Sequence, residues 1–175
     1  MRTLEVRRHS ERQKPGAHLN QAGVALARRV GASLGPFARV VTSDKPRAFE
    51  TALAMGFAVD EQLEGLGELG AGFTDEVAWD AGFAAIAAAL RQEGAVARYA
   101  RKLLKLWSSL AETVPPGQAL LVVSHGGIVE CGAVAALPAA DHAAWGGPLG
   151  LCEGVRLSFV SGRFTAGEVL RLPPA

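Results

Sequence analysis

The sequence predicts an α/β fold, a three-layer α/β/α sandwich whose mostly parallel sheet carries an antiparallel edge. Three observations support it. Apolar strand-like runs alternate with helical segments along most of the chain, which favours parallel strands joined by helical crossovers. Residues 119–124, ALLVVS, are apolar almost throughout, as expected for a strand covered on both faces. Residues 155–172 form two strand-like runs around Ser161-Gly162, which indicates a hairpin at one edge.

The first part of the chain reads as strand, helix, strand and helix. Residues 3–8 alternate apolar and polar side chains, which predicts a short strand. Residues 18–35 predict a helix, with Asn20 as a residue that can cap its start. Residues 38–43 form a β-branched run and therefore a second strand, and residues 45–56 form the next helix.

The middle of the chain carries fewer strand signals. Residues 56–79 are rich in glycine and weakly periodic, so we expect mostly loop. Residues 79–113 predict a long helical region that breaks near Gly94, with one apolar stripe along it. After the apolar strand, residues 126–137 predict the last helix.

Composition describes an ordinary globular protein. The chain has 175 residues, 49% hydrophobic and 20% charged, which suits a single domain over residues 1–175. Its formal net charge of +1 predicts no attraction to nucleic acid or to an anionic membrane. The two cysteines lack zinc-ligand spacing, and no apolar run is long enough to span a bilayer. We therefore expect a soluble cytoplasmic protein.

Polar side chains gather where three of the predicted strands end. Because the carboxyl ends of parallel strands meet at one edge of a sheet, we expect these side chains to converge. Two of the clusters also lie where a helix begins, and helix N-termini favour anions. Arginine forks match phosphate oxygens, so the sequence predicts a phosphate pocket. The side chains concerned are Arg8, His9, Ser43, Arg47, Ser124 and His125.

The order of these motifs resembles the histidine phosphatase superfamily, the phosphoglycerate-mutase-like group, and within it the small bacterial phosphatases. The family has an Arg-His-Gly motif, a Leu-Thr-x-x-Gly helix start, a Ser-x-x-x-Arg-Ala-x-x-Thr-Ala motif, a Leu-x-Glu-x-x-x-Gly motif and a His-Gly-Gly motif. In this chain they correspond to Arg8-His9-Ser10, Leu19 to Gly23, Ser43 to Ala52, Leu66 to Gly72, and His125-Gly126-Gly127.

The resemblance assigns a role to each pocket residue. His9 is the expected nucleophile, which forms a covalent phosphohistidine while a backbone carbonyl holds its other ring N–H. Arg8 and Arg47 are expected to clamp the phosphoryl oxygens. His125 is expected to be a third positive donor, kept protonated by the phosphate itself.

The resemblance also names a general acid and requires no metal or cofactor. Glu68 is expected to protonate the leaving oxygen and then to activate water. Glu64 lies close by in the same glycine-rich segment and stays an alternative, as does a purely surface role for Glu68. A zinc site made of His9, His125 and Glu68 is disfavoured, because two arginines beside it would repel a dication.

The chain departs from the family pattern near the nucleophile. Ser10 replaces the usual glycine, and its hydroxyl either binds phosphate or simply fits. Arg12 either reaches the substrate or is an ordinary surface residue. Glu5 and Arg7 occupy strand positions that are commonly apolar in the family, so we expect a salt-bridged or half-exposed pair.

Substrate choice is expected to come from residues 56–97, a candidate lid with few charges whose Phe73, Trp79 and Phe83 are either apolar walls or core. An uncharged lid disfavours a bisphosphate and favours a phosphomonoester with an apolar or bulky remainder. The short segment between His9 and Asn20 favours a phosphatase over a mutase, and a binding protein without turnover is a third alternative. Expected partners are a small phosphorylated substrate or a phosphoprotein, with a homodimer through the terminal hairpin edge.

Overall fold

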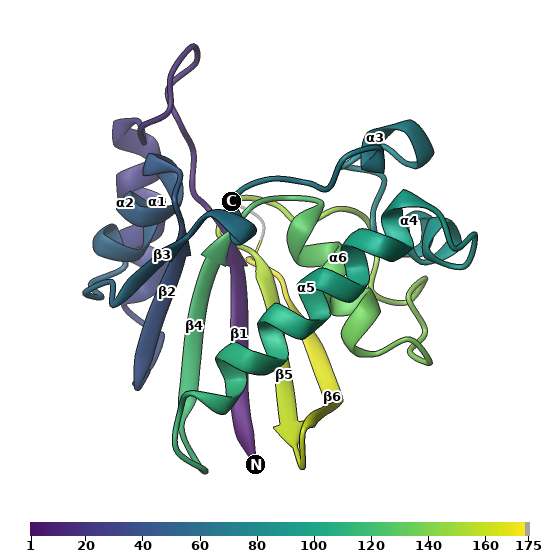
Figure 1. Ribbon diagram of the computed structural model, residues 1–175. Helices are drawn as coiled ribbons and strands as arrows, with labels where there is room; N and C mark the ends of the chain where they lie inside the picture. The colour runs from purple at the N-terminus through teal and green to yellow at the C-terminus, as the bar shows by residue number, and fades with distance from the viewer. Residues whose placement is uncertain (174–175) are drawn as a thin grey trace.

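The computed structural model describes residues 1–173, and its centre is one six-stranded sheet. The strands are β1 (Arg2–Arg8), β2 (Arg39–Ser43), β3 (Glu61–Leu63), β4 (Ala119–Ser124), β5 (Gly154–Val160) and β6 (Arg163–Leu170). Their order across the sheet is β3-β2-β4-β1-β5-β6 (Figure 1). The first four run parallel, and β5 and β6 add the antiparallel edge, as predicted.

Helices cover both faces of the sheet. They are α1 (Gln21–Gly31), α2 (Pro46–Ala54), α3 (Phe73–Glu76), α4 (Phe83–Leu90), α5 (Ala95–Glu112) and α6 (Ile128–Ala136), with one 3-10 turn, η1 (Glu64–Leu66). Successive side chains of β4 point to opposite faces. Leu121 and Val123 pack beside Ala48 of α2, whereas Leu120 and Val122 join the larger core formed with α4, α5 and α6. Figure 1 shows α5 and α6 in front of the sheet. No described helix is long and apolar enough to cross a bilayer.

Most helix and strand ends lie at residues that the sequence indicates as caps, breaks or turns. The Asn20 side chain caps α1 by accepting a hydrogen bond from the N–H of Gly23, at 2.7 Å. Gly94 is the break between α4 and α5, and the hairpin turns at Ser161-Gly162. The prediction of loop over residues 56–79 missed β3, which has three residues and pairs with β2. A strand this short has no readable periodicity, because its pairing with β2 defines it.

A buried charge network crosses the middle of the sheet. Glu5 and Arg7 are 1% and 4% exposed, so the alternative of a half-exposed pair is wrong and that of a salt bridge is confirmed. Glu5 accepts from Arg7 Nε at 2.5 Å and from Arg156 Nη2 at 2.9 Å. Arg7 also donates to the carbonyl of Cys152 at 2.8 Å. The neighbouring strand β5 therefore supplies a second counter-charge for Glu5, and the segment just before β5 supplies the carbonyl that Arg7 binds.

Removal of Glu5 should destabilise the fold strongly. In Glu5→Ala, Arg7 stays buried without its carboxylate, and breaking a buried pair in this way costs about 3–5 kcal/mol of unfolding free energy. Glu168 is the matched control, because it also pairs with Arg156 but is 60% exposed. Glu168→Ala should cost less than about 1 kcal/mol. Urea unfolding of both variants measures the difference, and similar losses in the two would contradict this account.

The fold brings the ends of three strands together. Arg8 of β1 lies opposite Ser124 of β4, and the N–H of His9 donates to the carbonyl of Ser124 at 2.9 Å. On its other side, β4 pairs with β2, which ends at Ser43 immediately before α2. The expected convergence of polar residues at the carboxyl edge of the parallel strands is therefore a direct result of the strand order.

Candidate active site

A pocket of about 370 Å³ opens at the carboxyl ends of the parallel strands. Of the six side chains that the sequence predicts for a phosphate pocket, the two arginines and two histidines line it, and Ser43 and Ser124 do not. Its walls are Arg8, His9, Glu11, Arg12, Lys14, Arg47, Trp79, His125, Gly126 and Leu151. The predicted convergence of two guanidiniums and two imidazoles is thus present in the structure.

His9 is held in one tautomer. Its Nδ1 lies 2.6 Å from the carbonyl oxygen of Ser10, which can only accept, so Nδ1 carries the proton. Its Nε2 then has a free lone pair, and Arg47 Nε donates to it at 3.2 Å. Burial lowers the pKa of His9 to about 4; the bond to Ser10 opposes this shift, and the charges of Arg47 and Arg8 add to it. Near neutral pH the ring is therefore uncharged.

His125 faces His9 across the pocket, with ring centroids 5.0 Å apart. Its Nε2 and the Ser43 hydroxyl are 2.7 Å apart, and its buried Nδ1 has no hydrogen-bond partner within residues 1–173. Burial, followed by the charges of His9 and Arg47, lowers the pKa of His125 to about 3. The free site therefore holds a neutral His125, and the expected positive form depends on an arriving phosphate to raise this pKa.

Hydrogen bonds to neighbouring segments position the two arginines. Arg8 Nη1 donates to the carbonyl of Leu149 at 2.6 Å, and its guanidinium carbon lies 5.3 Å from the centre of the Trp79 ring. Arg47 belongs to the first turn of α2, and its carbonyl accepts from Thr51 Oγ1 at 2.6 Å. Thr51 Oγ1 in turn accepts from the N–H of Ser10 at 2.9 Å. This chain of bonds ties the end of β1 to the helix that carries Arg47.

The structure places Ser10 and Arg12, the two residues near His9 whose roles the sequence left open, differently with respect to the pocket. Ser10 is fully buried, and its hydroxyl donates to the carbonyl of Gly23 at 2.7 Å. It lies outside the pocket lining, between the end of β1 and α1, an arrangement that favours the second alternative, in which the hydroxyl simply fits. Gly23 permits residues 10–11 to approach α1 closely, because a Cβ at this position would lie 2.0 Å from the carbonyl oxygen of Glu11. Arg12, in contrast, lines the pocket.

The structure does not bring Glu68 into the pocket. Its carboxylate pairs with Lys45 at 2.9 Å and its side chain is 66% exposed. Glu64 lies beside it in a separate surface hollow against α5. The three donors of the zinc alternative therefore do not meet. The carboxylate that lines the pocket is Glu11, which accepts from the Asn20 side chain at 2.6 Å.

The candidate lid contributes less than expected. Phe73 and Phe83 are fully buried in the core, so the alternative of core for both is confirmed. Among the described residues 56–97, Trp79 alone lines the pocket, and it is 41% exposed. Lys14 and Leu151 are lining residues that the sequence did not indicate, because neither belongs to a motif or to a periodic element.

Comparison with known proteins agrees with this geometry. A family model described as histidine phosphatase superfamily (branch 1) matches residues 5–169. A phosphoserine phosphatase from Entamoeba histolytica has a TM-score of 0.70 at 19% identity, with 96% of this chain and 97% of that chain covered. A mycobacterial glucosyl-3-phosphoglycerate phosphatase has a TM-score of 0.70 at 22% identity, with 99% and 100% covered.

A mutase has a similar fold. The phosphoglycerate mutase of Bacillus anthracis str. Sterne has a TM-score of 0.65 at 19% identity, with 93% of this chain and 90% of that chain covered. A search of curated proteins gives no match. The family match spans almost the whole chain and includes every residue that lines the pocket. This chain belongs to the histidine phosphatase superfamily, branch 1.

Proposed function

We propose that the protein hydrolyses phosphomonoesters through a covalent phosphohistidine on His9, without a metal ion. The observation that carries this proposal is the state of His9: a neutral ring whose Nδ1 proton is held by a carbonyl and whose Nε2 lone pair faces a guanidinium-lined pocket. A small phosphorylated molecule or a phosphorylated protein side chain is the proposed substrate.

The reaction proceeds in two displacements at phosphorus. His9 Nε2 forms a bond to phosphorus while the bond to the ester oxygen breaks, and the alcohol leaves with a proton. Water then attacks the phosphohistidine, the P–N bond breaks, and inorganic phosphate forms. Arg8 and Arg47 stabilise the charge on the equatorial oxygens in both steps. His125 donates a third hydrogen bond once the phosphate has raised its pKa.

Glu68 remains the proposed general acid, on the strength of its motif. For this role its carboxyl must leave Lys45 and turn towards the leaving oxygen, since the structure shows it paired outside the pocket. Its exposed position makes such a turn inexpensive, because an exposed ion pair contributes little free energy. Glu11 and Glu64 are the two carboxylates against which this assignment has to be tested.

Leaving-group dependence identifies the acid. Glu68→Gln should lower kcat for an alkyl phosphate about 100-fold, because an alkoxide needs a proton to leave. The loss should be much smaller for p-nitrophenyl phosphate, whose phenolate leaves unprotonated. Glu64→Gln and Glu11→Gln are the matched controls and should lack this difference between the two substrates. If either control shows the difference and Glu68→Gln does not, the assignment of Glu68 is wrong.

Hydrolysis in the presence of a chelator tests the proposal as a whole. Wild-type protein should release p-nitrophenol from p-nitrophenyl phosphate in excess EDTA. A second assay, with phosphoglycerate and a bisphosphate primer, tests the mutase alternative, for which we expect hydrolysis to exceed isomerisation. Absence of any release over a broad pH range would favour the binding protein without turnover.

A further inference from the structure

The active-site pocket holds more positive charge than a single phosphate requires. Four formally cationic side chains line it, and Glu11 is the one carboxylate among the lining residues. A phosphomonoester dianion neutralises two of these charges, and Glu11 offsets a third. One positive charge is left over, and it belongs to the outer part of the pocket, because Arg8 and Arg47 are the pair beside His9.

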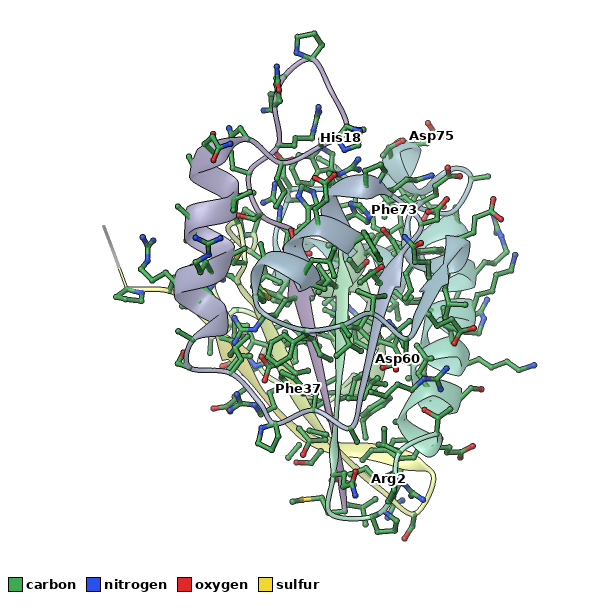
Figure 2. All side chains as sticks on the ribbon, turned by 90° about the vertical axis from the view of Figure 1, so that its left-hand side faces the viewer. Arg2, His18, Phe37, Asp60, Phe73 and Asp75 are labelled. Carbon is green, nitrogen blue, oxygen red and sulfur yellow. The ribbon has the colours of Figure 1, made fainter. Side chains whose placement is uncertain are left out.

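The surplus comes from a small hairpin that follows the nucleophile. Arg12 and Leu19 form a β-bridge, and the N–H of Gln13 donates to the carbonyl of His18 at 2.9 Å. The residues between them, 13–18, form a loop that rises above the strand ends in both views (Figure 1), and Figure 2 labels His18 on it. We call residues 12–19 the cationic hairpin, since Arg12 and Lys14 extend from it into the pocket wall.

The cationic hairpin is fixed relative to Arg8 and Arg47, which we call the phosphate clamp. Glu50 lies on α2, three residues after Arg47, and its Oε2 accepts from the N–H of Leu19 at 2.8 Å. Its Oε1 is hydrogen-bonded to His18 Nδ1. One helix thus positions both the inner guanidinium and the base of the hairpin. A rigid arrangement of this kind lowers the entropy cost of binding a second group.

Arg12 is held so that its charge acts inside the pocket. Its Nη1 donates to the carbonyl of Gly16 at 2.7 Å, which fixes the guanidinium across the hairpin. Its charge is among those that lower the pKa of His9, after burial and the nearer arginines, and it also lowers the pKa of Arg47. Arg12 also lines the same pocket of about 370 Å³ as Arg8 and Arg47, so one small molecule can contact all three guanidiniums.

The remaining wall is apolar. Trp79 lies over Arg8, and Leu151 also lines the pocket, so the space between the phosphate clamp and the hairpin suits a short carbon skeleton. We propose that the pocket selects phosphomonoesters whose organic part carries a second anionic group, bound by Arg12 and Lys14. This inference rests on the proposed function. It differs from the expectation of an uncharged surrounding, because the charges come from the hairpin and not from residues 56–97.

Three aryl phosphates that differ in one meta substituent test the inference. They carry a carboxylate, a neutral carbamoyl group of the same shape, or a second phosphate. We expect kcat/KM for the carboxylate or the phosphate compound to exceed that for the carbamoyl compound about tenfold, the size of one charge-assisted hydrogen bond. The better of the two anionic compounds identifies the anion.

Variants of the cationic hairpin test whether Arg12 and Lys14 cause the preference for anionic substrates. Arg12→Gln and Lys14→Gln should each reduce the ratio of anionic to carbamoyl kcat/KM at least threefold, and Lys14 is exposed enough that its replacement should not disturb folding. Arg163→Gln removes an equal charge from β6, at the far end of the sheet, and should leave the ratio unchanged. The ratio also cancels any general loss of rate in a variant.

The outcomes distinguish this inference from the proposed function. Hydrolysis of all three compounds at similar kcat/KM would overturn the second-anion site and leave the phosphatase mechanism standing. A preference that survives in the double variant Arg12→Gln/Lys14→Gln would also overturn it, because the anion would then be bound elsewhere. No hydrolysis of any compound would overturn both.

Discussion

Replacement of His9 by alanine should lower kcat/KM for p-nitrophenyl phosphate at least 1000-fold, the scale of losing an essential nucleophile. The reason is geometric: the Nε2 lone pair of His9 accepts from Arg47 Nε, so it lies beside a guanidinium that is proposed to hold the phosphoryl group. Phosphate binding should survive in the variant, because Arg8, Arg47 and His125 remain in the pocket wall. Titration calorimetry with inorganic phosphate measures that binding.

The effect of His9→Ala on the pH dependence of the unfolding free energy can also be predicted. The folded-state pKa of His9, about 4, lies below the ordinary value of 6.5. Between these values the unfolded chain binds the proton and the folded chain does not, so unfolding free energy falls as pH falls through this window. His9→Ala should flatten this dependence. A variant with wild-type activity and unchanged pH dependence of stability would contradict both the role and the environment assigned to His9.

Replacement of Arg47 by alanine should lower kcat by about 100- to 1000-fold, which is the usual effect of removing one preorganised donor to transition-state charge. Arg47 donates to His9 Nε2 in the free site, so it is already located where the phosphoryl group must arrive. Arg47→Lys should recover part of the rate only, because an ammonium restores the charge but not the planar fork.

The division between kcat and KM makes the Arg47 prediction specific. Steady-state kinetics on Arg47→Ala, with Arg163→Gln as a distant arginine control, should show most of the loss in kcat. A large rise in KM with kcat unchanged would mean that Arg47 binds substrate and transition state equally. The proposed stabilisation of the transferring group would then be wrong for this residue.

The part of the pocket around His9 could be predicted from the sequence, because its residues lie at the ends of strands or at the start of a helix. Arg8 and His9 end one strand, and His125 ends another. Parallel pairing of β1 with β4 puts such ends side by side without any detailed knowledge of the packing. Arg47 follows from a helix start directly after β2. The chemistry of small anions near helix N-termini supplied the rest of the prediction.

The part of the pocket formed by the cationic hairpin could not be predicted from the sequence, because long-range contacts determine its position. Lys14 reaches the pocket only because Glu50, more than thirty residues later, holds the hairpin by His18 and Leu19. No sequence pattern within residues 12–19 predicts these contacts with Glu50. Glu68 illustrates the opposite case: its motif is recognisable, but the glycine-rich segment around it has no periodicity that fixes where its side chain lies.

The central claim is a covalent bond between phosphorus and one ring nitrogen of His9. The most direct measurement is to mix the protein with a fast-leaving aryl phosphate, quench in alkali, which preserves phosphohistidine, and map the phosphopeptides by mass spectrometry. The account predicts a phosphoryl group on His9 that appears within one turnover and is absent in His9→Ala. Turnover with no phosphorylated residue, or with the label on a residue other than His9, would contradict it.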